Sequence, residues 1–445
     1  MSAGLDRTID EPTGSVRAGT TDVKEVSTPA ATSKAYRGWV LFLLLLTYVS
    51  SYVDRSIITI LAEPIKKDLG LSDGQLGLLG GLSFALFYTL LGIPIARLAE
   101  RYNRSLIISI SLIVWSGMTT LCGITTGYAQ LLLCRIGVGV GEAGGGPASH
   151  SLITDIFPAE RRASALSIYA LGFPLGSLIG AVAGGAMAQV WGWRTAFLIV
   201  GPPGILLALI VMFTIREPAR GQSDVVKVSD EVPPLGAVLR LLFSQPAFVQ
   251  LVAGATLLVL SGYGVALFMA PFFLRQYGFS IREVGLISGM VNGVAAGAGM
   301  LLGGFISDLA GRRDPRFYAW LPALCVAVAG PSFALAFLQT AWLPAMLLLM
   351  FGMMLIYTYF APTFAVMHNM VEPRMRATAA SILFLIINLV GVGLGPPIVG
   401  AVSDWFTLRL GSAAEGMRYA LVGCGLICLW SAVHFALAGA RLKRR

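Results

Sequence analysis

The stretch GWVLFLLLLTYVSSYVDRSIIT, residues 38–59, begins as an uninterrupted apolar run and then places an acid beside a base, Asp54 and Arg55. About 20 apolar residues in a helix are enough to cross the roughly 30 Å hydrocarbon layer of a membrane. Burying an ion in that layer costs about 2.5–3.5 kcal/mol on the translocon scale, so charged residues within a span usually face a cavity or a partner. The stretch therefore predicts a membrane-spanning helix that carries a functional face.

The composition of the whole chain agrees with a membrane setting. Of its 445 residues, 56% are hydrophobic, only 12% are charged and 52 are Gly, a pattern typical of closely packed membrane helices. The five Cys all lie in apolar runs, which indicates packing residues rather than disulfides or metal ligands. We recognise no catalytic set of residues and no metal-ligating cluster, so we predict a protein that is not an enzyme and binds no metal.

Apolar segments of spanning length, about twelve in all, follow one another between residues 38 and 440. The longest polar loop lies near the middle of the chain and suits a linker between two six-helix halves. We predict an all-α membrane protein of two pseudo-symmetric six-helix bundles. Its predicted parts are a disordered cytoplasmic tail (1–37), a first bundle (38–215), a cytoplasmic linker (216–245), a second bundle (246–440) and a basic cytoplasmic tail (441–445).

The basic residues indicate how the bundles are oriented. Most of the 32 Lys and Arg residues lie in loops on the side of the membrane that carries the amino terminus. The positive-inside rule then predicts that both termini are cytoplasmic. Because the bases are spread along one membrane face, they do not indicate nucleic-acid binding.

The two halves contain similar segments. GIPIARLAERYNR (92–104) matches GGFISDLAGRRDPR (303–316) in its Gly, its acid and its Arg cluster. RRASALSIYALGFPLG (161–176) matches RMRATAASILFLIINLVG (374–391) in its basic start and its small residues. Both pairs are separated by nearly the same length of chain, which predicts a duplicated half.

The span number, the middle loop and the repeated Gly–acid–Arg loop resemble the major facilitator superfamily over residues 38–440. Three motifs further resemble its spinster-like branch: TYVSSYVDR (47–55), ARLAERYNR (96–104) and RIGVGVGEA (135–143). One position departs from the family, since Glu100 stands where the family carries Asp.

The resemblance implies two bundles that rock about a central cavity, opening it to one side of the membrane at a time. It implies transport of lipid-like amphiphiles such as lysophospholipids or sphingoid phosphates, coupled to protons, with the proton gradient in place of a cofactor. It further implies a monomer, and a bacterial-type inner (plasma) membrane as the location. Two alternatives remain open: a multidrug or organic-anion carrier on the same scaffold, and a membrane protein that transports nothing, such as a sensor or an enzyme.

The charges within the predicted spans are the candidates for proton coupling. Asp54 in the first span and Arg135 in the fourth are expected at similar depth, and Glu142 follows Arg135 by two helical turns on the same face. We predict that Asp54 and Glu142 take up protons and that Arg135, which keeps its own proton, is their shared counter-charge. The alternative is a fixed ion pair that only joins two helices, and Arg55 is assigned a structural role.

Two further sets of candidates follow from the resemblance. Charged residues at the inner helix ends match the family's cytoplasmic gate: Glu100, Arg101, Arg104, Asp308, Arg312 and Arg313. Aromatic and amide residues on helices that usually line the cavity are candidates for substrate contact: Phe84, Phe87, Tyr88, Tyr169, Tyr263, Phe268, Asn292, Tyr357, Tyr359, Phe384 and Asn388. A cavity that is charged on one side and apolar on the other would suit an anionic head with an acyl tail.

Overall fold

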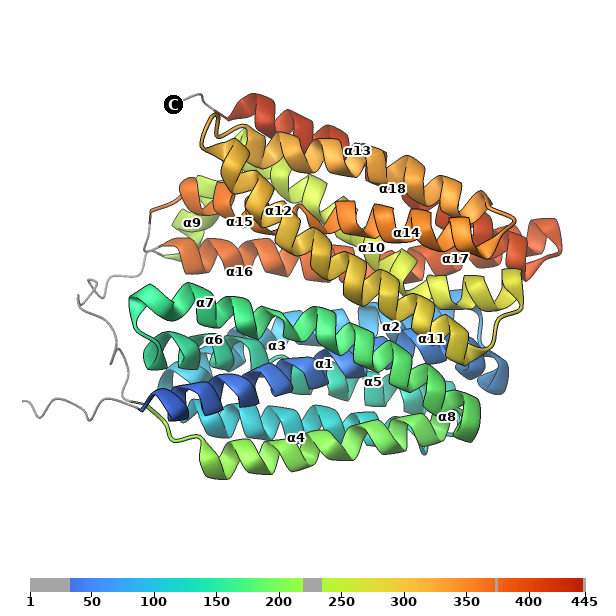
Figure 1. Cartoon of the computed structure of the whole chain (residues 1–445), viewed down its shortest axis with the longest axis horizontal. Coiled ribbons are helices and arrows are strands. Elements are labelled where there is room, and N and C mark those ends of the chain that lie inside the picture. The colour runs from blue at the N-terminus through green and yellow to red at the C-terminus, as the bar shows by residue number, and fades with distance from the viewer. Residues whose placement is uncertain (1–32, 219–233, 373–374, 443–445) are drawn as a thin grey trace, which may run out of the picture.

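The computed structural model describes residues 33–218, 234–372 and 375–442, and every regular element in these ranges is a helix. The chain folds into two halves that lie side by side (Figure 1). The first half comprises α1 (Lys34–Leu69), α2 (Asp73–Gly80), α3 (Leu82–Arg101), α4 (Arg104–Cys122), α5 (Tyr128–Glu142), α6 (Gly145–Ile156), α7 (Ala159–Ala170) and α8 (Gly172–Thr214). The second half follows α9 (Leu235–Phe243) and comprises α10 (Pro246–Tyr277), α11 (Ile281–Gly289), the π-helix η1 (Met290–Ala295), α12 (Ala296–Gly311), α13 (Phe317–Leu338), α14 (Trp342–Tyr357), α15 (Phe360–Asn369), α16 (Arg376–Ile386), the π-helix η3 (Ile387–Val392), α17 (Gly393–Leu410) and α18 (Ala413–Arg441).

These helices form twelve membrane spans, which confirms the predicted fold class. Within the described residues, ten helical segments are long and apolar enough to cross a membrane. One of them, Glu160–Thr214, has 55 residues and crosses twice. The remaining span consists of α5 and α6, whose 15 and 12 residues are too short to be counted singly.

The chain reverses within α8 at Gly192, where φ is 80° and ψ is 167°. Only glycine adopts a positive φ without a steric penalty, so VWGWR (190–194) turns sharply between the fifth and sixth spans.

Equivalent turns in the two halves are built in the same way. Between α1 and α2, Gly70 takes the left-handed conformation, and Ser72 and Gln75 form a capping box. Between α10 and α11, Gly278 is left-handed, and Ser280 and Glu283 form the same box. The duplication read from the sequence is therefore also visible in how the helices begin and end.

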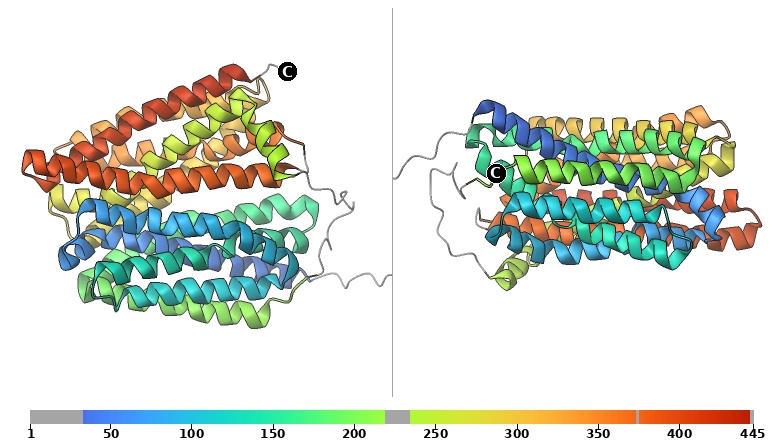
Figure 2. Two further views of the ribbon diagram at one scale, coloured as in Figure 1. Left: turned by 180° about the vertical axis from the view of Figure 1, so that it is seen from behind. Right: turned by 90° about the horizontal axis from the view of Figure 1, so that it is seen from below.

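The spans run between two ends of the molecule. Lys34, where α1 begins, and Arg441, where α18 ends, lie at the same end, which we call the terminal end. The opposite end, which carries the α1–α2 and α10–α11 turns, is the far end. Seen from behind, in the left view of Figure 2, the two halves again lie side by side as separate bundles, whereas they overlap in the view from below.

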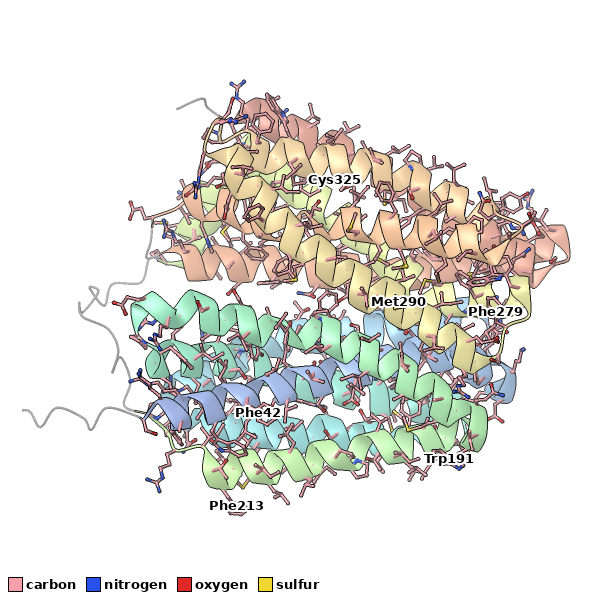
Figure 3. All side chains as sticks on the ribbon, viewed as in Figure 1. Phe42, Trp191, Phe213, Phe279, Met290 and Cys325 are labelled. Carbon is pink, nitrogen blue, oxygen red and sulfur yellow. The ribbon has the colours of Figure 1, made fainter. Side chains whose placement is uncertain are left out.

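Large apolar side chains cover the outer surface. Phe213 is 80% exposed, Trp191 58% and Phe42 49%, and Figure 3 shows Phe213 and Trp191 on the periphery of the first half. Exposed apolar surface of this extent would drive a soluble protein to aggregate, whereas hydrocarbon chains of a bilayer solvate it. The chain is thus an integral, multi-pass membrane protein.

Two predicted boundaries differ from the observed helices. Helix α1 begins at Lys34, inside the predicted tail, because the Ser33 side chain accepts a hydrogen bond from Tyr36 N and caps it. The predicted linker contains α9, whose start follows Pro234. The predicted disorder of residues 1–32 and the middle of the linker, 219–233, lie outside the described residues.

Close backbone contact joins the halves toward the far end. A Cβ atom on Gly285 of α11 would lie 2.6 Å from the Ala181 carbonyl oxygen of α8, and one on Gly185 would lie 2.7 Å from Ile281 O. Side chains at these positions would force the halves apart, so glycine is required for this contact.

We expect Gly285→Val to lower the apparent unfolding temperature, since overpacking of such contacts costs about 1–3 kcal/mol. The matched control is Gly423→Val on α18, where an added Cβ meets nothing within 4 Å. Equal unfolding temperatures for the two variants in a thermal-shift assay would contradict the importance of the α8–α11 contact.

Candidate functional site

Four charged side chains form a cluster inside the first half. Helix α1 supplies Asp54 and Arg55, and α5 supplies Arg135 and Glu142. Asp54 and Arg135 are 1% exposed and Glu142 is 3% exposed, whereas 17% of the Arg55 side chain is accessible. Two acids and two bases compensate each other's charge, which reduces the cost of burying them. We call these residues the charge cluster.

Glu142 is bound by α1. Its Oε2 accepts hydrogen bonds from Arg55 Nε at 2.7 Å and from Ser51 Oγ at 2.8 Å, and Arg55 Nη2 lies 2.6 Å away as an ion pair. Ser51 and Arg55 are one helical turn apart, so both side chains project from the same face of α1 toward α5. Arg55 is therefore part of the site, which its predicted structural role did not include.

Arg135, predicted as the shared counter-charge, does not take that position. Arg135 and Glu142 share a face of α5, but two helical turns separate them by about 10 Å along the axis. In the structure, Arg55 of α1 makes the ion pair with Glu142 at 2.6 Å, whereas Arg135 is an electrostatic neighbour of Asp54. The sequence placed the charges on the right helices but assigned the wrong partner to Glu142.

Asp54 lies beside Arg135 without a close ion pair. Its electrostatic neighbours are Glu142, Arg135 and the Thr119 hydroxyl of α4. Among the described residues, Asp54 Oδ2, Arg135 Nε and Nη1, and Glu142 Oε1 have no hydrogen-bond partner. Buried polar groups are nearly always paired, so these atoms retain binding capacity for a proton or a polar ligand.

Three aromatic rings surround the Arg55 guanidinium. Its Cζ lies 4.5 Å from the ring centroid of Phe84, 4.9 Å from Tyr88 and 5.0 Å from Tyr52. Phe84 and Tyr88, both predicted to line the cavity, stack on each other on α3 with centroids 5.3 Å apart. We call Tyr52, Phe84 and Tyr88, together with Glu142, the Arg55 cage. The Phe84 ring also lies 5.9 Å from Arg135 Cζ.

A series of aromatic rings in stacked and edge-to-face contact connects this site to the second half. Tyr169 stacks on Tyr48 at 4.6 Å, Tyr48 contacts Tyr52 at 5.1 Å, and Tyr52 contacts Phe173 at 4.9 Å. Phe173 then stacks on Tyr357 of α14 at 5.2 Å. Two predicted cavity residues, Tyr169 and Tyr357, thus belong to one aromatic series that crosses between the halves.

The other predicted cavity residues fall into two groups. Tyr263 of α10 is an electrostatic neighbour of Arg55, and Asn292 and Asn388 lie in the π-helices η1 and η3, a backbone form frequent at functional sites. Phe268, by contrast, is fully buried in the second-half core. Phe384 packs on Phe364 at 4.8 Å, and its carbonyl accepts a hydrogen bond from Asn388 at 2.8 Å.

The charged residues predicted to gate the terminal end are found in their own halves. Arg104, only 1% exposed, donates to Glu217 at 2.6 Å and to Asp155 at 2.5 Å, all within the first half. Asp308 accepts a hydrogen bond from Tyr318 at 3.3 Å, and Arg101, Arg312 and Arg313 are exposed. The side chain of Glu100 lies outside the described residues.

Polar contacts between the halves gather instead at the far end. Arg275 of α10 donates to Glu63 at 2.6 Å and to Asp73 at 2.7 and 2.8 Å. Ser403 of α17 donates to Asp73 at 2.8 Å, and Lys66 lies 2.6 Å from the same carboxylate. We call Glu63, Lys66, Asp73, Arg275, Ser403 and Asp404 the far-end network.

Asp404 completes this network by capping a helix of the other half. Its carboxylate accepts hydrogen bonds from the backbone N–H groups of Asp73 and Gly74, at 3.0 and 2.8 Å, at the amino terminus of α2. Free N–H groups at that terminus favour an anion, so the cap is both a hydrogen bond and a charge–dipole contact. Sequence reasoning counted Lys66 and Arg275 only as loop charges and missed this network. Its one signal in the sequence is Asp73, the acid that follows the helix cap Ser72.

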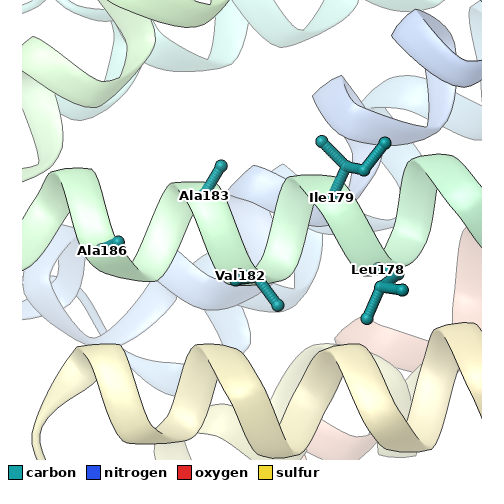
Figure 4. Close-up of a pocket in the computed structure, with 5 residues that line it drawn as sticks. All are labelled: Leu178, Ile179, Val182, Ala183 and Ala186. Carbon is teal, nitrogen blue, oxygen red and sulfur yellow. The ribbon is translucent and has the colours of Figure 1, made fainter.

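An apolar groove on the surface differs from this site in character. It measures about 420 Å³ and is lined by Leu178, Ile179, Val182, Ala183 and Ala186 of α8, beside the eighth span (Figure 4). Its lining offers no polar group, so polar recognition belongs to the charge cluster.

Two halves closed together at one end, with buried charges and aromatic rings between them, define a membrane transporter of the two-bundle class. The model of the Major Facilitator Superfamily matches residues 44–396. The chain is 35% identical to an MFS-type efflux pump of Mycolicibacterium smegmatis, over 88% of this chain and 90% of that one. It is 27% identical to Protein spinster homolog 1 of Xenopus tropicalis, over 89% and 80% of the two chains.

A solved structure is similar over nearly its whole length. It is a bacterial homolog of the human lysosomal transporter Spinster in an inward-facing, unoccupied conformation, with a TM-score of 0.85, 35% identity and coverage of 92% of this chain and 98% of that one. The chain therefore belongs to the major facilitator superfamily, in its spinster-like branch. It is a transporter of small substrates and not an enzyme, as the sequence predicted.

We expect Arg275→Gln to open the far end. Arg275 is 8% exposed, and breaking a buried ion pair by removing one partner costs about 3–5 kcal/mol. Spin labels on Gln189 of α8 and Leu408 of α17 would report a longer distance by double electron–electron resonance. Arg282→Gln, which changes an exposed arginine on α11, is the control. An unchanged distance in Arg275→Gln would show that the network does not hold the halves together.

Proposed function

We propose that this chain is a proton-coupled secondary transporter of amphiphilic, lipid-like substrates of the lysophospholipid or sphingoid type. The observation that carries the proposal is the charge cluster, in which two buried carboxylates and Arg135 keep unused hydrogen-bonding capacity beside a set of aromatic rings. One side of this region is charged and the other is aromatic, which suits a polar head joined to an apolar tail. Similarity to spinster proteins supports this substrate class.

Glu142 and Asp54 are the proposed proton carriers. Arginine keeps its proton, so the charge of the cluster changes only through the carboxylates. A proton on Glu142 removes the charge that holds Arg55 between α1 and α5. Protonation and substrate binding then act on the same ion pair, and this shared use of one pair is the proposed coupling. The proton gradient is the energy source, and no cofactor is required.

Alternating access follows from the asymmetry between the ends. The far-end network and the α8–α11 glycine contact hold the halves together at one end, whereas at the terminal end the contacts of Arg104 and Asp308 described above stay within their own halves. By the positive-inside rule, we infer that the terminal end faces the cytoplasm. The conformation is then inward-facing, with the chain acting as a monomer in a bacterial-type plasma membrane. The inward-facing relative supports this assignment.

The test is lysophospholipid flux into liposomes, with and without a pH gradient. We expect the native protein to follow the gradient, and we expect Asp54→Asn and Glu142→Gln to bind substrate but to lose gradient-driven flux. Glu160→Gln, an exposed acid on α7, is the matched control and should behave as the native protein. Gradient-driven flux in both cluster variants would refute the assignment of the proton carriers.

A second candidate function is export of drugs or organic anions on the same scaffold. The 35% identity to an MFS-type efflux pump favours it. Liposomes that move no lysophospholipid but do move structurally unrelated organic ions would establish this alternative over the first.

A further inference from the structure

The Arg55 cage has the chemistry of a receptor for organic cations. Three ring faces lie within 5.0 Å of one cationic centre, and the Glu142 carboxylate pairs with the same cation at 2.6 Å. An aromatic enclosure closed by a carboxylate is the arrangement that proteins use for quaternary ammonium groups, because ring faces carry negative electrostatic potential. Here a guanidinium of the protein itself occupies the enclosure.

The walls of the cage are formed independently of Arg55. Phe84 and Tyr88 stack on each other, with an interplanar angle of 19°, and Phe84 is 4% exposed. Tyr52 is fixed by contacts with Tyr48 and Phe173. Glu142 is fixed by the hydrogen bond from Ser51. These contacts do not involve Arg55, so they remain available to hold the rings and the carboxylate when the guanidinium is displaced.

The cage disfavours an anion as its first ligand. Arg55 directs both Nε and Nη2 at Glu142, so part of its donor capacity is already used by a carboxylate. The ring faces around the guanidinium repel negative charge. Arg135 offers unpaired donors, but it is 1% exposed, and its Cζ lies 5.9 Å from the Phe84 ring centroid. Arg55, with 17% of its side chain accessible, is the group that can exchange.

We propose that the Arg55 cage is a headgroup site for a quaternary ammonium group on an amphiphile, which binds by replacing the Arg55 guanidinium against Glu142 and the three rings. This inference rests on the proposed function and specifies its substrate class. Exchange of one cation for another leaves the charge at Glu142 balanced. In a zwitterionic lysophospholipid the released guanidinium then pairs with the phosphate, whereas a cationic amphiphile provides no such partner.

Binding of three probes to the purified protein in nanodiscs at pH 8 tests the proposal: dodecyltrimethylammonium, lysophosphatidylcholine and lysophosphatidic acid. Arg55→Met keeps an apolar side chain of similar length but removes the competing charge. We expect it to bind dodecyltrimethylammonium about tenfold more tightly than the native protein does. Phe84→Leu should bind the same probe about tenfold more weakly. Arg282→Met, on the exposed surface of α11, should change neither affinity.

Comparing the two ammonium probes shows whether the ligand is a cationic amphiphile or a zwitterionic lysophospholipid. For Arg55→Met, we expect a smaller gain with lysophosphatidylcholine than with dodecyltrimethylammonium, because the phosphate loses its arginine. If Arg55→Met bound both dodecyltrimethylammonium and lysophosphatidic acid more weakly than the native protein does, the proposal would be overturned. Arg55 would then be a direct substrate contact. Should Arg55→Met fail to fold, an unchanged affinity in Phe84→Leu would overturn it equally.

The binding experiment tests the cage separately from the transport function proposed above. Ammonium binding with the expected response to Arg55→Met, in a protein that moves no lysophospholipid, would refute the proposed function and keep the cage. If the protein moved lysophospholipid along the pH gradient but Arg55→Met and Phe84→Leu left its affinity for the ammonium probe unchanged, the cage would be refuted. The proposed function would stand.

Discussion

The ion pair between Arg55 and Glu142 joins two helices in a medium where an unpaired charge is costly. Because the hydrocarbon layer offers no water, each of the four charges of the cluster depends on the others for compensation. The pair also determines where Arg55 lies, and through Arg55 it determines which rings surround a cation. The aromatic series that starts at Tyr52 then reaches Tyr357 in the second half. The Arg55–Glu142 ion pair is thus connected, through a series of ring contacts, to the interface between the two halves.

The two ends of the molecule differ in how the halves meet. At the far end, Arg275 binds two carboxylates of the first half, and Asp404 caps a helix that belongs to it. At the terminal end, Arg104 satisfies its donors within its own half. A transporter that opens one end at a time needs contacts that form at one end while they are broken at the other. The charge cluster lies between these ends, where it can respond to both.

Much of the fold followed from the sequence, because hydrophobic length and the positions of Gly and Pro are local properties. The spans, the two halves and the helices that carry Asp54, Arg135 and Glu142 needed no knowledge of packing. The partner of Glu142 did, since Arg55 and Glu142 are distant in sequence and only the tertiary fold brings these side chains of α1 and α5 together. The far-end network was missed for the same reason, and the π-helices at Asn292 and Asn388 leave no trace in a periodicity of apolar residues.

The central claim is that one end opens only as the other closes. Two distances measured by double electron–electron resonance in nanodiscs test it most directly: Glu160 to Asn369 across the terminal end, and Gln189 to Leu408 across the far end. When the pH is lowered from about 8 to about 5, the proposed proton coupling predicts that the first distance shortens while the second lengthens. Distances that change in the same direction, or that change at one end alone, would contradict it.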